Sequence, residues 1–279
     1  MYNEYYSFGG LSLHLTGETP WQSSDICDPF RTDKVDADHT VHVTVSDDFP
    51  DMPKNVENGD GICRGRDNDG FYLLQSFGNG FRMFASRKNN VTNVILSSKY
   101  IGRLSTRSII EASGIFDLLA EHEMLVLHSS YIVTKDGDGI LFSGPSGIGK
   151  STQAELWQKY ASAVTVNGDR SLVRVSDGTA HGFMYSGTSG ICKNVSAPIK
   201  AIVLPTQSQH NKVCRPRPKE AFVRVLNQCS YYQWSSDSSK RMTDLVARLV
   251  NRVPIYVLDC TKDEGAVRAL ESALANNSI

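Results

Sequence analysis

The sequence predicts an α/β fold in two parts, a β-rich N-terminal region over residues 1–105 and an α/β domain over residues 106–279. Three observations lead to this prediction. Short segments of the first part alternate apolar and polar side chains, which is typical of half-buried strands. The second part alternates apolar strands with amphipathic helices. A glycine-rich loop at residues 144–151 stands between one of these strands and the helix that follows it.

Length, composition and charge exclude several classes of protein. The chain has 279 residues, 40% of them hydrophobic, so it can bury a sizeable core in one large or two small domains. Its net charge of −1 gives no broad basic surface for nucleic acid. No apolar run approaches the roughly 20 residues that cross a bilayer, and the first residues lack the features of a secretory signal. We therefore expect a cytoplasmic protein with neither nucleic acid nor membrane as a partner.

Cysteines and histidines are scattered along the chain. The six cysteines include no Cys-x-x-Cys pair, so we expect reduced thiols and neither a zinc site nor a disulfide framework. His39 and His42 flank Val41 in a strand-like segment. Strand alternation would place the two histidines on opposite faces, which argues against a shared metal.

The β-rich region is predicted from five strand-like segments, at residues 11–15, 40–45, 71–74, 81–84 and 91–96. The last three are separated by Gly78-Asn79-Gly80 and Lys88-Asn89-Asn90, which have turn chemistry, so they predict a meander. Residues 47–69 are rich in Asp, Asn, Gly and Pro, and we expect a mobile loop there.

The segment before the glycine-rich loop starts with a predicted helix. One apolar helix face is indicated by Ile109, Ile110, Phe116, Leu118 and Leu119. Ser105 or Thr106 can serve as its N-cap. Strands are predicted at residues 124–127, 130–133 and 140–142, with a turn at 135–139 before the last of them.

Helices and strands continue to alternate after the loop. A helix over residues 152–160 is followed by a strand at 163–166, which runs into Asn167-Gly168-Asp169-Arg170 and pairs across this turn with residues 171–175. A second glycine-rich segment spans residues 186–190. The near-continuous apolar run at 201–205 predicts a strand buried on both faces. The remaining elements are helices at 219–228 and 239–251, a strand at 255–258 and a helix at 263–275.

Residues 144–151 read Gly-Pro-Ser-Gly-Ile-Gly-Lys-Ser, which fits the phosphate-binding pattern Gly-x-x-x-x-Gly-Lys-Ser. Glycines let backbone N–H groups approach phosphate oxygens, and the N-terminus of the following helix favours negative charge. We expect the nucleotide to be bound by Gly144, Ser146, Gly147, Ile148, Gly149, Lys150, Ser151 and Thr152. Lys150 would reach the β- and γ-phosphates, and the Ser151 hydroxyl would bind Mg²⁺. The predicted ligands are therefore ATP, or another nucleoside triphosphate, and Mg²⁺.

Two further side chains can complete a site for phosphoryl transfer. Asp169 follows the strand at 163–166, eighteen residues past Ser151, and ligands of α/β sheets lie at the carboxyl ends of strands. It is a candidate for the metal-side carboxylate, the proton acceptor or both, although Asp is also common in turns. His128 follows an apolar strand sixteen residues before Gly144, and both a structural and a catalytic role fit a lone histidine.

Several segments occur in an order that is known from one kinase family. They are His128, the loop at 144–151, Gly168-Asp169-Arg170, and residues 186–191, 198–202 and 253–258. Through these segments, the region from about residue 125 to residue 274 resembles the kinase domain of HPr kinase/phosphorylase and its HPr-kinase-like relatives. The fold of that family is similar to the nucleotide-binding core of phosphoenolpyruvate carboxykinases.

The resemblance implies a function for these residues. It implies an ATP- and Mg²⁺-dependent kinase that transfers the γ-phosphate to a serine-like hydroxyl of a peptide or protein. Precursors of ribosomally made natural products, such as lasso peptides, are among the substrates of such relatives. The resemblance implies that Lys150 and Ser151 hold triphosphate and Mg²⁺, that Asp169 binds metal or activates the hydroxyl, and that His128 lies close to Asp169. Relatives often form rings, so a homo-oligomer is compatible with the resemblance.

The chain departs from the family pattern in two places. The bifunctional enzyme has two adjacent acids where this chain has Gly168 and Asp169. The signature Glu-x-Arg-Gly-x-Gly, which is tied to phosphorolysis, is replaced over residues 184–190, so we predict no phosphorylase activity. The β-rich region does not resemble the HPr kinase N-terminal domain and is a candidate for substrate recognition.

Three basic residues are candidates for contacts to phosphate or to an acidic substrate, namely Lys193, Arg215 and Arg217. A solvated basic loop is the alternative for the two arginines.

Two other functions also fit the motifs. The missing acid at Gly168 is compatible with a nucleotide-binding regulatory module without transfer activity, and the loop is equally compatible with a small-molecule hydroxyl kinase. The sequence identifies no residue that would distinguish ATP from GTP.

Overall fold

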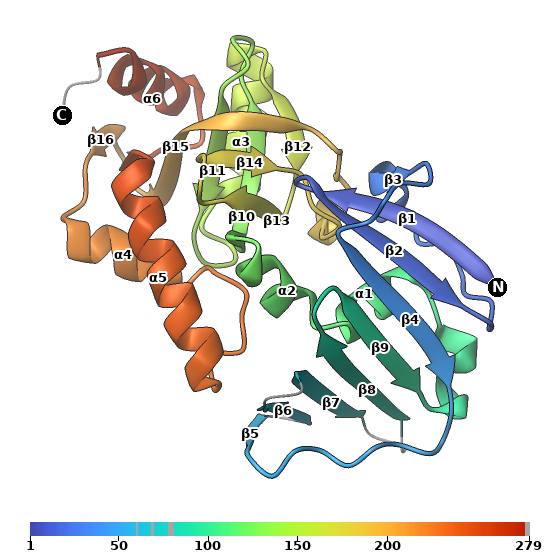
Figure 1. Cartoon of the computed structure of the whole chain (residues 1–279). Coiled ribbons are helices and arrows are strands. Elements are labelled where there is room, and N and C mark those ends of the chain that lie inside the picture. Colours follow the sequence, from blue (N-terminus) through green and yellow to red (C-terminus); the bar gives the residue numbers. More distant parts are fainter. Residues whose placement is uncertain (60, 68–69, 78–80, 277–279) are drawn as a thin grey trace. The chain divides into compact units, whose positions relative to one another are not determined.

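The computed structural model describes residues 1–59, 61–67, 70–77 and 81–276, and these form a mixed α/β protein with two large sheets (Figure 1). The chain divides into two compact units. The first consists of Met1–Leu118 and Tyr232–Ser239, and the second of Leu119–Tyr231 and Lys240–Ile279. The composition of the sequence changes near residue 105, whereas the first unit continues to Leu118. Among the described residues, no helix combines the length and apolar character needed to cross a membrane.

In its described residues, the first unit forms a nine-stranded sheet with the order β3-β1-β2-β4-β9-β8-β7-β6-β5. The strands are β1 Tyr2–Phe8, β2 Leu11–Gly17, β3 Arg31–Thr32, β4 His39–Val45, β5 Val56–Gly59, β6 Ile62–Arg66, β7 Phe71–Phe77, β8 Phe81–Lys88 and β9 Val91–Leu96. The pairs β2–β4 and β4–β9 are parallel, and the other neighbours are antiparallel. The predicted β-rich character of this region is confirmed.

The predicted meander is also confirmed, because β7, β8 and β9 pair antiparallel in succession. Asn89, in the turn between β8 and β9, has a φ of 53°, a left-handed conformation that asparagine tolerates. The turn predicted at Gly78-Asn79-Gly80 lies outside the described residues. His39 is buried and His42 exposed, as alternation along β4 predicts.

The mobile loop predicted over residues 47–69 is wrong in part. β5 and β6 lie within it, and β6 pairs antiparallel with β5 on one side and β7 on the other. These backbone hydrogen bonds outweigh the weak strand propensity of the Asn- and Gly-containing sequence.

Two short helices replace the single helix predicted after residue 105, α1 Thr106–Ala112 and α2 Ile115–Glu121. Gly114 separates them with a φ of 73°, which ends the first helix. Ser105 is the N-cap of α1. Its hydroxyl accepts a hydrogen bond from the Ser108 N–H at 3.3 Å, and the Ser105 N–H donates to the Ser108 hydroxyl at 2.9 Å. This capping box satisfies two backbone donors at the start of the helix.

The described part of the second unit contains an eight-stranded sheet. Its strands are β10 Met124–Val133, β11 Gly139–Ser143, β12 Val164–Asn167, β13 Arg170–Arg174, β14 Thr179–His181, β15 Ser196–Gln207, β16 Lys212–Cys214 and β17 Ile255–Cys260. The helices that follow β11 are α3 Lys150–Ala161, α4 Pro218–Leu226, α5 Ser236–Arg252 and α6 Glu264–Asn276. Short 3-10 helices span Asp28–Phe30 and Ser98–Arg103 in the first unit and Gly187–Ser189 in the second.

Helices supply apolar residues to both faces of the parallel strands β11, β15 and β17. Leu141 and Ile202 belong to one buried cluster with residues of α4 and α5. Their neighbours Phe142 and Val203 belong to a second cluster with residues of α3 and α6. This alternation follows from the period of two along a strand. β15 pairs in parallel with β11 and β17, and its residues 201–205 are all buried, so the strand predicted from the apolar run is confirmed.

Candidate functional site

The glycine-rich loop lies between β11 and α3. β11 is buried along its whole length, and α3 begins at Lys150. Gly147 and Gly149 have φ values of 78° and 112°, conformations that favour glycine, and Gly149 is the N-cap of α3. At Gly144, an added Cβ would lie 3.1 Å from the Ile148 Cγ2, so the loop is closely packed there. This strand–loop–helix arrangement is the context in which the sequence pattern binds phosphate.

Lys150 folds back onto the loop that precedes it. Its ammonium donates to the carbonyl oxygens of Gly144 at 2.9 Å and Pro145 at 3.0 Å. Burial lowers the pKa of Lys150, and the charge of Asp169 opposes this shift. The side chain is 8% exposed, so the loop positions one cation at its centre.

A pocket of about 290 Å³ lies beside the loop, with a largely polar lining. The residues that line it are His128, Ser146, Gly147, Gly149, Lys150, Ser151, Thr152, Gly168, Asp169, Thr188 and Ser189. His128, Asp169 and most of the predicted loop residues therefore line the same pocket. Of the predicted nucleotide contacts, Gly144 and Ile148 do not line this pocket; both line a neighbouring one.

The strand pairings explain why His128 and Asp169 reach the loop. β10 is one ten-residue strand, so the two strands predicted at 124–127 and 130–133 are one, and His128 lies inside it. Ser129 of β10 pairs with Ser143 of β11, which places His128 beside the start of the loop. His128 also pairs with Arg170 of β13, directly after Asp169.

The residues around Asp169 differ from the predicted hairpin. β12 and β13 each pair with β10, so the described pairings do not join β12 to β13 across the turn as predicted. Gly168 and Asp169 form the connection between β12 and β13, which both pair with β10. The Asp169 carbonyl oxygen accepts a hydrogen bond from the Ser129 N–H at 2.8 Å, which fixes the backbone of this connection to β10.

Asp169 lies between two basic side chains. The His128 Nε2 is 3.3 Å from one carboxylate oxygen, and the Arg170 Nε is 3.6 Å from the other. Arg170 is itself held in place, because it donates to the Ser230 hydroxyl at 2.9 Å and its guanidinium lies 5.5 Å from the centre of the Tyr185 ring. The carboxylate is about one-third exposed, so it can face a ligand in the pocket.

The pKa of His128 is lowered from 6.5, first by burial and then by the positive charges of Lys150 and Arg170. The charge of Asp169 and a hydrogen bond that the imidazole donates to Gln228 act in the opposite direction. His128 is therefore neutral at pH 7. A neutral imidazole with its proton on Nε2 can donate to the adjacent carboxylate.

The space beside Gly168 is filled by its neighbours. A Cβ on Gly168 would lie 1.9 Å from the Ser189 Oγ, and a Cβ on Gly187 would lie 2.7 Å from the Asp169 Cβ. The second glycine-rich segment thus packs directly against the Gly168-Asp169 connection. Its residues Thr188 and Ser189 line the pocket, a role that the sequence alone did not assign to them.

The three basic candidates are not brought into this pocket. The exposed side chain of Lys193 does not line it, although the backbone N–H of Lys193 donates to the Val166 carbonyl of β12. Arg215 donates to the Tyr256 hydroxyl at 3.1 Å and lies over that ring. Arg217 is the exposed N-cap residue of α4. Arg170, which the sequence reasoning left without a role, is the arginine beside Asp169.

The oxygen-bearing side chains of the pocket fit a metal ion that binds together with a phosphate ligand. Among the described residues, no group of three or more His, Cys, Asp or Glu side chains could hold a metal ion, and all six cysteines are free thiols. The pocket offers instead one carboxylate, from Asp169, with the hydroxyls of Ser151, Thr188 and Ser189. Mg²⁺ is commonly bound by one or two protein oxygens together with substrate phosphates and water.

Comparison with known families adds one match. The family model described as SynChlorMet cassette protein ScmC matches residues 103–271, which include the loop, His128 and Asp169. The search of curated proteins finds no match to the chain. Because the matched region covers more than half of the 279 residues, the chain belongs to the ScmC family of SynChlorMet cassette proteins.

Proposed function

We propose that this protein is an ATP- and Mg²⁺-dependent kinase, with an HPr-kinase-like core, that transfers the γ-phosphate to a serine-like hydroxyl of a peptide or protein. One observation carries the proposal. A single pocket brings together the phosphate-binding loop, its lysine and serine, and a carboxylate beside a neutral histidine. These are the groups that phosphoryl transfer needs for binding charge and for removing a proton.

Binding of the triphosphate depends on the loop and the start of α3. The positive φ values at Gly147 and Gly149 allow backbone N–H groups of the loop to face a phosphate. The N-terminus of α3 adds a favourable dipole. The Lys150 ammonium would exchange its two carbonyl partners for phosphate oxygens, which a charged donor binds more strongly.

Ser151 and Asp169 are the residues that would hold Mg²⁺ together with the phosphates. When bound, the ion neutralises negative charge on the phosphate oxygens. The absence of a ligand cluster of its own among the described residues supports binding as a complex with the nucleotide.

The transfer is a displacement at the γ-phosphorus. The acceptor hydroxyl oxygen forms a bond to the γ-phosphorus, and the bond from that phosphorus to the β–γ bridging oxygen breaks, so that ADP leaves with the electron pair. The hydroxyl proton passes to the Asp169 carboxylate. His128, whose Nε2 lies 3.3 Å from the carboxylate, would hold Asp169 in place.

A nucleotide-binding regulatory module is the second candidate, and Gly168 favours it. One carboxylate has to serve the metal and the proton, because Ser189 occupies the space of a second acid. A small-molecule hydroxyl kinase would use the same residues. The family is described as a cassette protein, so products of neighbouring genes are the first acceptors to test.

The test is incubation with Mg-ATP and a panel of acceptors that includes peptides from neighbouring genes, serine and sugars, with phosphate transfer read by mass spectrometry. We expect a phosphorylated serine-like residue, and we expect Lys150→Ala to reduce the rate at least about a hundredfold. Lys159→Ala, on the exposed face of the same helix, is the matched control. Tight binding of ATP that stays intact with every acceptor would support the regulatory module instead.

A further inference from the structure

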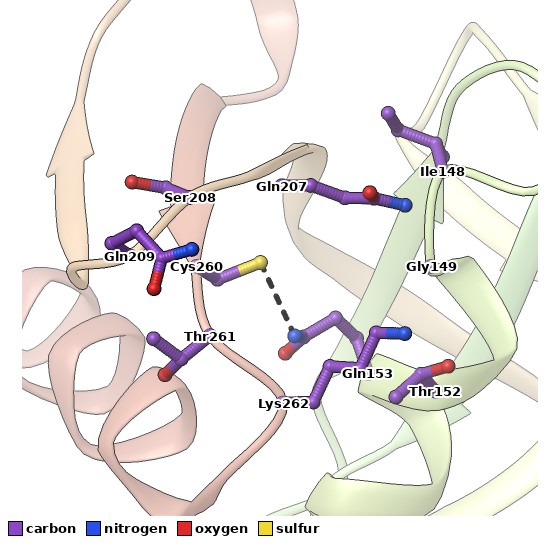
Figure 2. A pocket seen from close by; sticks show the side chains of 10 residues that line it. All are labelled: Ile148, Gly149, Thr152, Gln153, Gln207, Ser208, Gln209, Cys260, Thr261 and Lys262. Atoms are coloured by element: carbon purple, nitrogen blue, oxygen red, sulfur yellow. Dashed lines mark hydrogen bonds between the residues drawn. The ribbon is translucent and has the colours of Figure 1, made fainter.

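A second pocket lies beside the start of α3 (Figure 2). Its volume is about 460 Å³, in the range of pockets that hold small molecules. It is formed by the loop, the first turn of α3, the ends of β15 and β17, and the turn after β17. The residues that line it are Ile148, Gly149, Thr152, Gln153, Gln207, Ser208, Gln209, Cys260, Thr261 and Lys262.

The two pockets are contiguous, because Gly149 and Thr152 line both of them. A ligand with its phosphates at Lys150 can therefore continue past the N-terminus of α3 into the second pocket. This geometry suits a nucleotide, which has a charged end and an uncharged aromatic end. The first pocket is lined by the Asp169 carboxylate, the Lys150 ammonium, His128 and hydroxyls, whereas the second is lined by amides, hydroxyls, the Cys260 thiol, the apolar Ile148 and the Lys262 ammonium.

Gln153 is the side chain that points to the kind of ligand. Gln153 is 2% exposed and lies against Cys260. The Gln153 Nε2 donates a hydrogen bond to the Cys260 sulfur at 3.3 Å (Figure 2). Its Oε1 has no hydrogen-bond partner among the described residues. A buried amide oxygen without a partner is costly, so it marks a place where a donor belongs.

Adenine supplies the matching groups. A glutamine amide can pair with an amino group and a neighbouring ring nitrogen of adenine, as it does in base recognition in nucleic acids. Where adenine carries its amino donor, guanine carries the O6 acceptor, which cannot pair with the unpartnered Oε1 of Gln153 in the same orientation of the base. Gln207 is anchored at the pocket's edge, because its Nε2 donates to the Gly147 carbonyl at 3.1 Å.

We propose that this pocket binds the adenosine part of the nucleotide and that Gln153 makes the protein selective for adenine over guanine. The proposal rests on the proposed function, because it presumes that the triphosphate occupies the loop. In Figure 2 the Lys262 side chain points toward the start of α3, where the ribose would join the phosphates.

The experiment measures binding of Mg-ATP, Mg-GTP and Mg-tripolyphosphate by calorimetry. We expect wild-type protein to prefer ATP to GTP about tenfold or more, and Gln153→Leu to lose about tenfold in ATP affinity with tripolyphosphate unchanged. Gln158→Leu makes the same chemical change on the exposed side of α3 and is the control. Equal affinities of wild-type protein for ATP and GTP, or unchanged ATP affinity in Gln153→Leu, would overturn the proposal.

A second measurement on wild-type protein avoids any effect of the substitution on folding. Excess adenosine should displace Mg-ATP, whereas guanosine at the same concentration should not, because only the adenine amino group pairs with the Gln153 Oε1. Equal displacement by the two nucleosides would overturn the proposal. Failure of tripolyphosphate and ATP alike to bind would overturn the proposed function itself, so the two failures are distinguishable.

Discussion

At the scale of single residues, the surroundings of His128 and Asp169 explain how one carboxylate could serve a transfer reaction. Burial and two nearby cations keep His128 neutral, and its Nε2 lies 3.3 Å from the carboxylate. Arg170 lies 3.6 Å from the other carboxylate oxygen and is fixed by Ser230. The sequence predicted both His128 and Asp169 as candidates. It could not assign Arg170, because that role depends on the pairing of β10 with β13.

A second histidine of the same unit makes stability depend on pH. His181 of β14 is buried, its Nδ1 lies 2.6 Å from the Ser196 Oγ, and its Nε2 has no partner among the described residues. Burial, aided by the charge of Arg174, lowers the pKa of His181 from 6.5 to about 4. Between these two values the unfolded chain binds a proton that the folded chain does not, so protonation favours unfolding.

We therefore expect the stability of the second unit to fall by about 3 kcal/mol as the pH decreases from about 6.5 to about 4, as a contribution of His181. This contribution is constant above the unfolded value, because His181 is then neutral in both states. Urea denaturation at several pH values measures it. His181→Gln should remove this pH dependence, whereas His122→Gln, at an exposed site, should keep it. Parallel pH profiles of wild-type protein and His181→Gln would show that His181 does not cause this pH dependence.

At the scale of elements, packing of the second glycine-rich segment decides what residue 168 can be. The Ser189 Oγ occupies the position of a side chain at Gly168, and Gly187 lies against Asp169. The glycine pattern of residues 186–190 was visible in the sequence, but its partner was not. The contact joins two segments that are distant along the chain, and no local pattern records which residue fills the space.

Placing an acid at residue 168 should therefore need two changes. We expect Gly168→Asp to lower the free energy of unfolding by about 1–3 kcal/mol, because the new side chain overlaps Ser189. Gly168→Asp combined with Ser189→Gly should recover most of that loss. Urea denaturation measures both variants, with Gly102→Asp as a control at a site where an added Cβ meets nothing within 4 Å. Full stability of the single Gly168→Asp variant would show that this contact is not tight.

Element prediction from sequence succeeded where periodicity was strong. The strand at β9 and the buried strand within β15 were predicted from alternation and from a continuous apolar run. β5 and β6 were missed, because Asn- and Gly-containing segments form strands only when neighbouring strands supply hydrogen bonds. The break at Gly114 was missed too, since the apolar spacing continues across it.

At the scale of the whole molecule, the first unit is discontinuous in sequence. It includes Tyr232–Ser239 as well as Met1–Leu118. Arg64 of β6 joins these parts, because it bonds Asp117 at 3.0 Å, the Ser235 hydroxyl at 2.9 Å and Asp237 at 3.0 Å. Asp117 also accepts a hydrogen bond from the Ser238 hydroxyl at 2.7 Å. Sequence reasoning placed residues 1–105 together and could not foresee that a segment more than 110 residues later completes the unit.

This buried network gives a prediction for the stability of the first unit. Arg64 and Asp117 have side-chain exposures of 2% and 4%, so Arg64→Met would leave a buried carboxylate without its cation. We expect a loss of about 3–5 kcal/mol in the free energy of unfolding, measured by urea denaturation. Arg66→Met removes a 3.7 Å ion pair with Asp237 at an exposed site and should cost less than about 1 kcal/mol. Similar losses in the two variants would refute the role given to Arg64.

We propose above that the pocket around the loop transfers a phosphoryl group with Asp169 as proton acceptor. The most direct measurement is the single-turnover rate of phosphate transfer from saturating Mg-ATP to an identified acceptor, in wild-type protein and Asp169→Asn. Asp177→Asn, at a site that does not line the pocket, is the control. We expect a rate at least about a hundredfold lower in Asp169→Asn only. Near-wild-type transfer by Asp169→Asn would contradict this proposal.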